Sequence, residues 1–172
     1  MNKIKDVILK KYIDLRLKLF PPDKEARNFP QLIREIKNIL VLLPAQSAWE
    51  DDFQRFTSDL YKVFPEASIS TFERRSFRKS DGNWMGLPSD AYMSQFTEVQ
   101  FDLVIDLTPE SDRLSTYICA LSGAPLRMRL SEGGLSHIYN LHVRTDPQKP
   151  QKEKLKSITE QLRVFKKGTH PQ

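Results

Sequence analysis

The fold class follows from one run of residues, Phe101-Asp102-Leu103-Val104-Ile105-Asp106-Leu107. A second run, Ile-Leu-Val-Leu-Leu at residues 39–43, is bounded by Asn38 and Pro44. Short apolar runs with few polar interruptions predict strands that are buried on both faces, as in parallel sheets covered by helices. We therefore expect both runs in the centre of one sheet.

Apolar residues at helical spacing flank the two runs. The expected helices cover residues 4–19, 30–37, 50–64, 109–122 and 151–165. The expected shorter strands cover residues 67–72, 126–130 and 138–143. Strands that alternate with helices in this way are typical of α/β proteins. We interpret the chain as a three-layer Rossmann-like domain with a mostly parallel sheet and flanking helices.

The chain has the length and composition of a single globular domain. It has 172 residues, of which 39% are hydrophobic and 28% charged, and these fractions exclude the disordered and collagen-like classes. We distinguish an N-terminal helical segment at residues 1–37 and a Rossmann-like α/β domain at residues 38–148. A basic C-terminal helix and tail occupy residues 149–172.

The net charge of +5 comes from the two ends of the chain. Residues 1–20 hold six basic and two acidic residues, and residues 149–172 hold seven basic and two acidic ones. The residues between them carry a net charge of −4. Basic helices suit an anionic membrane surface or nucleic-acid phosphates. The alternative for the first helix is packing on the sheet, and for the last helix it is a solvated face.

The location expected for the protein is the cytoplasm, or the membrane surface if the basic termini bind lipid. The longest apolar run, at residues 39–43, is far shorter than the roughly 18 to 20 residues that span a bilayer, so no transmembrane segment is expected. Asp6 and Asp14 interrupt the N-terminal segment, which therefore does not read as a signal peptide. The single cysteine, Cys119, excludes a disulfide within the chain.

Two loops are expected at the carboxyl ends of the central strands, where open parallel sheets bind their ligands. The loop after the first strand offers Gln46, Ser47 and Trp49, and the loop after the second offers Thr108 and Ser111. Backbone N–H groups at the helix starts that follow would receive an anionic group. Capping of the next helix is the alternative role for Thr108 and Ser111.

Charged residues supply further candidates. Arg74, Arg75 and Arg78 form a cluster that would hold a phosphate or an acidic sugar, or else lie on a solvated loop. Asp106, at the carboxyl end of its strand, is a candidate acid or base, whereas Asp102 near the start of the strand is expected to be structural.

No cofactor and no metal are expected. The dinucleotide motif G-x-G-x-x-G and the phosphate loop G-x-x-x-x-G-K-[ST] are both absent. The chain has one cysteine and three histidines, which is too few for a typical zinc site. Cys119 lies inside an expected helix, where a buried and unreactive thiol is the default.

Five stretches follow one another in a recognisable order. They are Asn38-Ile39-Leu40-Val41-Leu42-Leu43, Val63-Phe64-Pro65-Glu66-Ala67, the run at residues 101–107, Leu121-Ser122-Gly123-Ala124-Pro125 and Tyr139-Asn140-Leu141-His142-Val143. Together they resemble the N-terminal, acceptor-side domain of heptosyltransferase-type glycosyltransferases over roughly residues 38–145. The resemblance implies a Rossmann-like half that holds the sugar acceptor, while a second half binds the nucleotide sugar.

The sequence departs from that family at its catalytic loop. There the family carries a Gly-Asp pair whose Asp is the base toward the acceptor hydroxyl, and this chain has Ala48 and Trp49. Glu50, just beyond them, and Asp106 are the remaining catalytic candidates. The chain also ends after the first half. We therefore expect a non-catalytic accessory or binding protein, with a protein partner or a sugar or anionic ligand.

Two alternatives stay open. One is a glycosyltransferase subunit whose active site is completed by a partner chain. The other is a basic module that binds nucleic acid or an anionic membrane surface through its termini.

Overall fold

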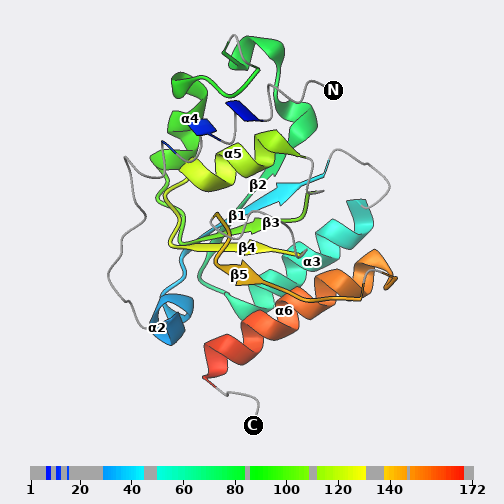
Figure 1. Cartoon of the computed structure of the whole chain (residues 1–172). Helices are drawn as coiled ribbons and strands as arrows, with labels where there is room; N and C mark the ends of the chain where they lie inside the picture. Colours follow the sequence, from blue (N-terminus) through cyan, green and yellow to red (C-terminus); the bar gives the residue numbers. More distant parts are fainter. Residues whose placement is uncertain are drawn as a thin grey trace.

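A five-stranded parallel sheet forms the centre of the protein (Figure 1). The computed structural model describes residues 7, 8, 11, 12, 15, 29–44, 50–83, 86–108, 112–130, 138–146 and 148–168. The strands are β1 (Asn38–Leu43), β2 (Ser68–Glu73), β3 (Leu103–Asp106), β4 (Leu126–Arg129) and β5 (Leu141–His142). Their order is β2-β1-β3-β4-β5, and every pair is parallel. The predicted three-layer α/β architecture is confirmed.

Helices cover both faces of the sheet (Figure 1). They are α2 (Phe29–Arg34), α3 (Glu50–Val63), α4 (Asp90–Thr97), α5 (Arg113–Leu121) and α6 (Gln151–Lys167). Helices α3 and α6 lie on one face and α4 and α5 on the other. Two short 3-10 turns, Arg74–Ser76 and Lys79–Asp81, follow β2.

Alternate residues of the central strands contribute side chains to two separate cores, because successive side chains point to opposite faces of a sheet. On β3, Leu103 and Ile105 join the core beneath α3 and α6, whereas Val104 joins the core beneath α4 and α5. The α3 and α6 core is apolar throughout. On the α5 side, the carboxyl ends of β3 and β4 carry charged side chains instead.

The strand order reverses between β1 and β3. The chain runs from β1 outward to β2 at one edge, then crosses back to β3 on the other side of β1. Such a reversal is where open α/β sheets leave a crevice beyond the carboxyl ends of their strands. The segments that follow β1 and β3 there, residues 45–49 and 109–111, lie outside the described residues.

The first predicted helix is only partly described. Val7, Ile8, Lys11, Tyr12 and Leu15 are helical. The ring of Tyr12 stacks on that of Tyr117 in α5, with centroids 6.0 Å apart. Val7, Ile8 and Leu15, which belong to the same predicted apolar stripe, are about half exposed.

Two local expectations were wrong. Helix α4 was not predicted, because Met93 and Phe96 are its only buried residues and give little periodicity. The predicted helix start at Thr108 is not a cap, since Asp112 caps α5 by accepting a hydrogen bond from the Ser115 N–H at 3.2 Å. Thr108 bonds to Asp106 instead.

Candidate functional site

A line of paired residues crosses the whole sheet at the carboxyl ends of the strands. From edge to edge it consists of Phe72, Leu42, Asp106, Arg129 and His142, each in register with the next. Paired residues of parallel strands point to the same face, which here is the α5 side. The first two are apolar. The last three, which we call the polar row, place a carboxyl, a guanidinium and an imidazole on neighbouring strands.

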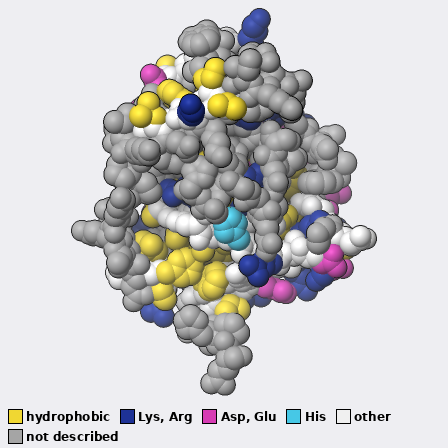
Figure 2. Space-filling view, in the orientation of Figure 1, with side chains coloured by type: hydrophobic (Ala, Val, Ile, Leu, Met, Phe, Trp, Pro, Cys, Tyr) yellow, Lys and Arg dark blue, Asp and Glu magenta, His cyan; other side chains and the backbone are white. Residues whose placement is uncertain are grey.

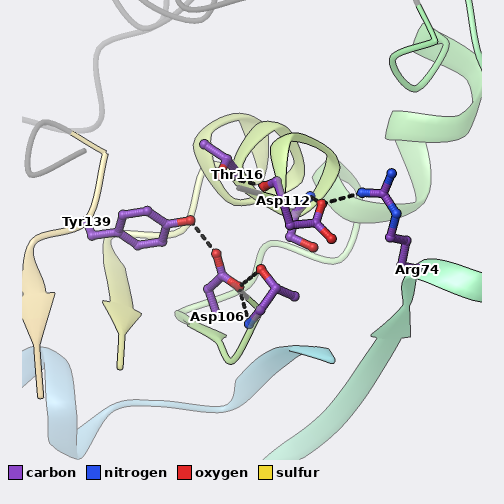
Figure 3. Close-up of polar contacts among 7 residues, drawn as sticks. Arg74, Asp106, Asp112, Thr116 and Tyr139 are labelled. Atoms are coloured by element: carbon purple, nitrogen blue, oxygen red, sulfur yellow. Dashed lines mark hydrogen bonds and ion pairs between the residues drawn. The ribbon is translucent and has the colours of Figure 1, made fainter. Parts of the chain in front are cut away.

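The carboxyl group of Asp106 is fully buried and has hydrogen bonds on both oxygens (Figure 3). Its Oδ1 accepts from the Thr108 N–H at 2.9 Å and from the Thr108 hydroxyl at 2.6 Å. Its Oδ2 accepts from the Tyr139 hydroxyl. Asp106 is therefore held in one orientation by residues of its own loop and of the segment before β5.

Arg129 is the unusual member of the polar row. It is 1% exposed, yet within the described part of the chain its Nε and both terminal nitrogens are buried without a hydrogen-bond partner. The guanidinium carbon lies 4.8 Å from the centroid of the Tyr139 ring, a cation–π arrangement. The Nδ1 atom of His142, the next member of the row, is likewise buried without a partner.

Arg127, two residues earlier on β4, is a buried arginine whose guanidinium does have hydrogen-bond partners. Its Nε donates to the Ile138 carbonyl at 2.5 Å, and its Nη1 donates to the Ala124 carbonyl at 2.9 Å. Arg127 thus ties β4 to the loops on either side of it, and its role is structural. The guanidinium of Arg129 has no such carbonyls.

The start of α5 lies beside the polar row (Figure 3). Asp112, which is 8% exposed, accepts from the Arg74 Nη1 at 2.6 Å in addition to capping the helix. The hydroxyl of Thr116 donates back to the Asp112 carbonyl at 2.9 Å. Arg74 therefore joins the end of β2 to the first turn of α5.

Burial sets the protonation of the groups around Arg129. It raises the pKa of Asp106, and the hydrogen bonds from Thr108 and Tyr139 together with the charge of Arg129 oppose that rise only in part. Burial likewise raises the pKa of Tyr139 and of the Cys119 thiol. Tyr139 is therefore a neutral donor, and Cys119 is a neutral side chain within α5.

The predicted site residues do not all meet at one place. Asp106 and Thr108 bond to each other, and Arg74 reaches the start of α5. Arg78 is exposed and uses its backbone N–H to donate to Asp81 at 2.8 Å. The candidates Gln46, Ser47, Trp49 and Ser111 lie outside the described residues.

The other two candidates, Glu50 and Arg75, lie away from the polar row. They line a cleft of about 470 Å³ between α3 and β2, on the opposite face of the sheet. Arg75 forms an ion pair with Glu73 there. The predicted arginine cluster is thus divided, with Arg74 directed to α5 and Arg75 to α3.

Sequence reasoning missed Arg129, Tyr139 and His142 as site residues. The alternation Leu126-Arg127-Met128-Arg129 predicts a strand with one solvent-exposed face, but in the structure all four residues are buried. The available signal was that arginines at alternate positions of a strand inside an α/β domain must be buried. The pairing of Arg129 with Asp106 depends on the register between β3 and β4, which cannot be read from the sequence.

Among the residues that the structure describes, neither a metal-binding cluster nor a membrane-spanning helix is found. No group of three or more His, Cys, Asp or Glu side chains is arranged to hold a metal ion. None of the described helices combines the length and the apolar character needed to cross a bilayer.

Comparison with known families gives one match. The model of a family of unknown function, DUF6913, matches residues 5–162. The chain belongs to this family. The region that defines DUF6913 contains all five strands and the complete polar row. Neither the curated proteins nor the solved structures contain a match to this DUF6913 chain.

Proposed function

We propose that this protein binds a small molecule carrying a phosphate or carboxylate group at the polar row, and that it acts by binding. The observation that carries the proposal is Arg129, a guanidinium that is 1% exposed and has no hydrogen-bond partner for any of its three nitrogens. A guanidinium has five N–H donors in a planar fork, which matches the paired oxygens of a carboxylate or a phosphate.

An unpaired buried cation is costly, and an anion at this position would remove the cost. Leaving a buried charge without a partner costs several kcal/mol, typically about 3–5. Asp106 removes it only in part, because its Oδ1 already accepts two hydrogen bonds from Thr108 and its Oδ2 accepts one from Tyr139. Burial also raises the pKa of Asp106, which disfavours the negative charge that would balance Arg129.

The position of Arg129 supports a ligand as the missing partner. Arg129 is the last residue of β4, and it lies at the carboxyl ends of the strands, where Rossmann-like folds bind ligands. His142 adds an imidazole with a buried, unpartnered nitrogen on the next strand. An anion bridging these two residues would satisfy both, whereas a residue buried only for stability is expected to have its partners in place.

Binding is favoured over catalysis by how the neighbouring groups are held. A general base needs a free lone pair within reach of its proton, and three of the roughly four lone-pair positions of Asp106 already accept hydrogen bonds from Thr108 and Tyr139. Burial raises the pKa of Cys119 and keeps this thiol unreactive. Glu50, the other catalytic candidate, lines the cleft on the opposite face.

The resemblance to the acceptor half of heptosyltransferase-type glycosyltransferases stays a hypothesis that is compatible with this proposal. An acceptor-side half acting by itself would be expected to bind the acceptor and not to transfer a sugar. The alternative of a glycosyltransferase subunit completed by a partner chain differs from it in one measurable respect. It requires a second protein before sugar transfer is seen.

Binding of nucleic acid or an anionic membrane through the termini has less support. On the face shown in Figure 2, the described Lys and Arg side chains are scattered and form no continuous stripe. In α6, Lys166 donates to the Val63 carbonyl at 2.6 Å and lies over the Phe64 ring, so it fixes α6 to α3. Lys156 pairs with Glu160.

The proposal is tested by thermal unfolding in phosphate against chloride at matched ionic strength. Phosphate is expected to raise the Tm of the wild-type protein along a saturable curve, since a ligand that binds only the folded state stabilises it. Arg129→Met, which keeps an unbranched apolar side chain and removes the guanidinium, should abolish that rise. The control is Arg163→Met, which removes an exposed arginine from α6 and should leave the response unchanged.

Two results would contradict the proposal. One is a phosphate response of Arg129→Met equal to that of the wild-type protein. The other is the absence of any saturable response to phosphate and to small carboxylates such as citrate, which would make Arg129 a structural residue.

A further inference from the structure

The outer edge of β2 has unpaired backbone groups. β2 is the first strand in the sheet order and pairs only with β1. The Ser68 N–H donates inward to the Lys37 carbonyl at 2.7 Å. Because backbone groups of successive strand residues point to opposite sides, those of Ile69, Thr71 and Glu73 point outward. Within the described part of the chain, no strand pairs with this edge.

The described residues of β2 carry none of the sequence devices that normally protect an edge strand. Edge strands are usually blocked by Lys, Pro, a bulge or a covering element. The sequence of β2 is Ser-Ile-Ser-Thr-Phe-Glu, without lysine or proline, and its pairing with β1 is regular over all six residues. An exposed edge of this kind readily accepts another strand.

A groove runs beside this edge. It is the cleft of about 470 Å³ noted above, which we call the edge groove. Its floor is formed by Leu43, Pro44 and Phe53, and β2 contributes Thr71 and Glu73. Its far wall is α3, whose outward residues Glu50, Gln54, Ser58 and Tyr61 follow one another along the helix.

The dimensions of the edge groove suit an extended peptide. The twelve residues from Glu50 to Tyr61 span about 16 Å along a helix, at roughly 1.5 Å per step. About five residues of an extended chain span the same length, at roughly 3.3 Å per residue. A strand added to β2 would direct alternate side chains into the groove.

The charge of the edge groove favours a basic side chain. Its lining carries two carboxylates, Glu50 and Glu73, against one guanidinium, Arg75. Glu73 is paired with Arg75, whereas Glu50 has no hydrogen bond or close ion pair with another described residue and interacts with Arg75 only at longer range through its charge. At the other end, Tyr61 is 45% exposed and offers an aromatic face. A lysine or arginine stem would lie on the apolar floor with its charge at Glu50.

We propose that the edge groove binds an extended segment of a partner protein, which adds a strand to β2 and places a lysine or arginine beside Glu50. Main-chain hydrogen bonds to Ile69 and Thr71 supply the affinity, and the groove supplies the selectivity. The site is separate from the polar row, which lies on the opposite face of the sheet.

Selection from a phage-displayed library of random heptapeptides tests the proposal. Peptides enriched on the wild-type protein should share a lysine or arginine at one position. Thr71→Pro removes an N–H that points away from β1, so the sheet is retained, and it should weaken the Kd of a synthesised peptide at least tenfold. The control is Ser70→Ala on the same strand, whose side chain points to the opposite face of the sheet and outside the groove, and it should bind like the wild-type protein.

A second pair of variants tests the charge. Glu50→Gln should lower the preference of the selected peptides for lysine or arginine over glutamine about tenfold. Asp51→Asn removes an exposed carboxylate from the same helical turn, outside the groove, and should leave the preference unchanged. If Thr71→Pro does not fold, hydrogen exchange of the wild-type amides replaces it. The exchange of the Ile69 and Thr71 amides should slow when the peptide binds.

Three results would overturn the proposal. The first is a library that yields no binder. The second is a peptide whose Kd is the same for Thr71→Pro, or whose binding leaves the Ile69 and Thr71 amides unprotected. The third is a dimer that Thr71→Pro converts to monomer and that the peptides do not displace. That result would identify the occupant as a second copy of this chain.

Discussion

Arg127 and Arg129 lie two residues apart on the same face of β4, yet one donates to two backbone carbonyls and the other to none. Both are almost completely buried. Two identical side chains in one strand therefore have opposite energetic roles, and substitutions at the two positions should have opposite effects.

Arg127→Met should destabilise the protein by about 2 kcal/mol or more, because the Ile138 and Ala124 carbonyls lose their donor in a buried environment. Arg129→Met should leave the ligand-free protein unchanged or stabilise it by about 1–3 kcal/mol, since replacing an uncompensated buried charge with an apolar chain removes its desolvation cost. Urea denaturation in chloride buffer, without phosphate, measures both. Equal destabilisation by the two variants would show that Arg129 is satisfied by water.

Asp106→Asn should change how stability depends on pH. The pKa of Asp106 in the folded protein lies above its ordinary value of 3.8, chiefly because of burial. Its contribution to stability is therefore complete below that value and is lost as the pH rises through the folded pKa. The asparagine variant has no such loss, so it should gain relative to the wild-type protein as the pH rises above about 4.

Urea titrations of both proteins at several pH values measure that difference. A gap that moves in favour of the wild-type protein as the pH rises would mean that Asp106 is ionised and compensates Arg129. The requirement for an external anion would then disappear.

Asp112→Ala should cost about 1–2 kcal/mol of stability, because it removes both the cap of α5 and the partner of Arg74. Arg74→Ala removes the ion pair alone. Since Arg74 is about half exposed, its loss should cost at most about 1 kcal/mol. Asp112→Asn is the matched control, since asparagine caps helices as well as aspartate. If Arg74→Ala cost as much as Asp112→Ala, the ion pair and not the cap would hold the start of α5.

Cys119 should not react with Ellman's reagent in the native protein. The thiol is fully buried, and burial raises its pKa, so the reactive thiolate is scarce. In urea the same reaction should release one equivalent of chromophore per chain. Gln95→Cys, an exposed position in α4, should add one rapidly reacting thiol and so verify the assay. Rapid reaction of native Cys119 would show that α5 opens readily.

Much of the fold was predictable because burial on both faces leaves a clear pattern. The apolar runs at residues 39–43 and 101–107 became β1 and β3, and Asp102 holds the structural place expected for it by accepting from the Lys37 and Asn38 N–H groups. The start of α5 was not predictable in the same way. The hydroxyl of Thr108 has two suitable partners in sequence. It would accept from a backbone N–H of the next helix or donate to the carboxylate of Asp106, and only the folded chain shows that it donates to Asp106.

The candidate site was predicted in part. Asp106 and Thr108 were named because they follow a central strand, and position along a strand is readable from the sequence. Arg129 was not, because its significance depends on two long-range facts. β4 must align Arg129 with Asp106, 23 positions earlier, and the loops around β4 must supply carbonyls to Arg127 but not to Arg129.

Both faces of the sheet pack on apolar cores, but the α5 face also carries the buried polar row, and we expect this difference to set the order in which the domain opens. The α3 and α6 layer rests on a continuous apolar core, whereas the carboxyl end of the α5 layer rests on Asp106, Arg129 and Tyr139. Native-state hydrogen exchange should therefore release the amides of α5 at lower free energy than those of α3. A ligand bound to Arg129 would raise the free energy of local unfolding of α5 toward that of α3. Ligand binding should therefore slow the hydrogen exchange of amides across the whole α5 layer.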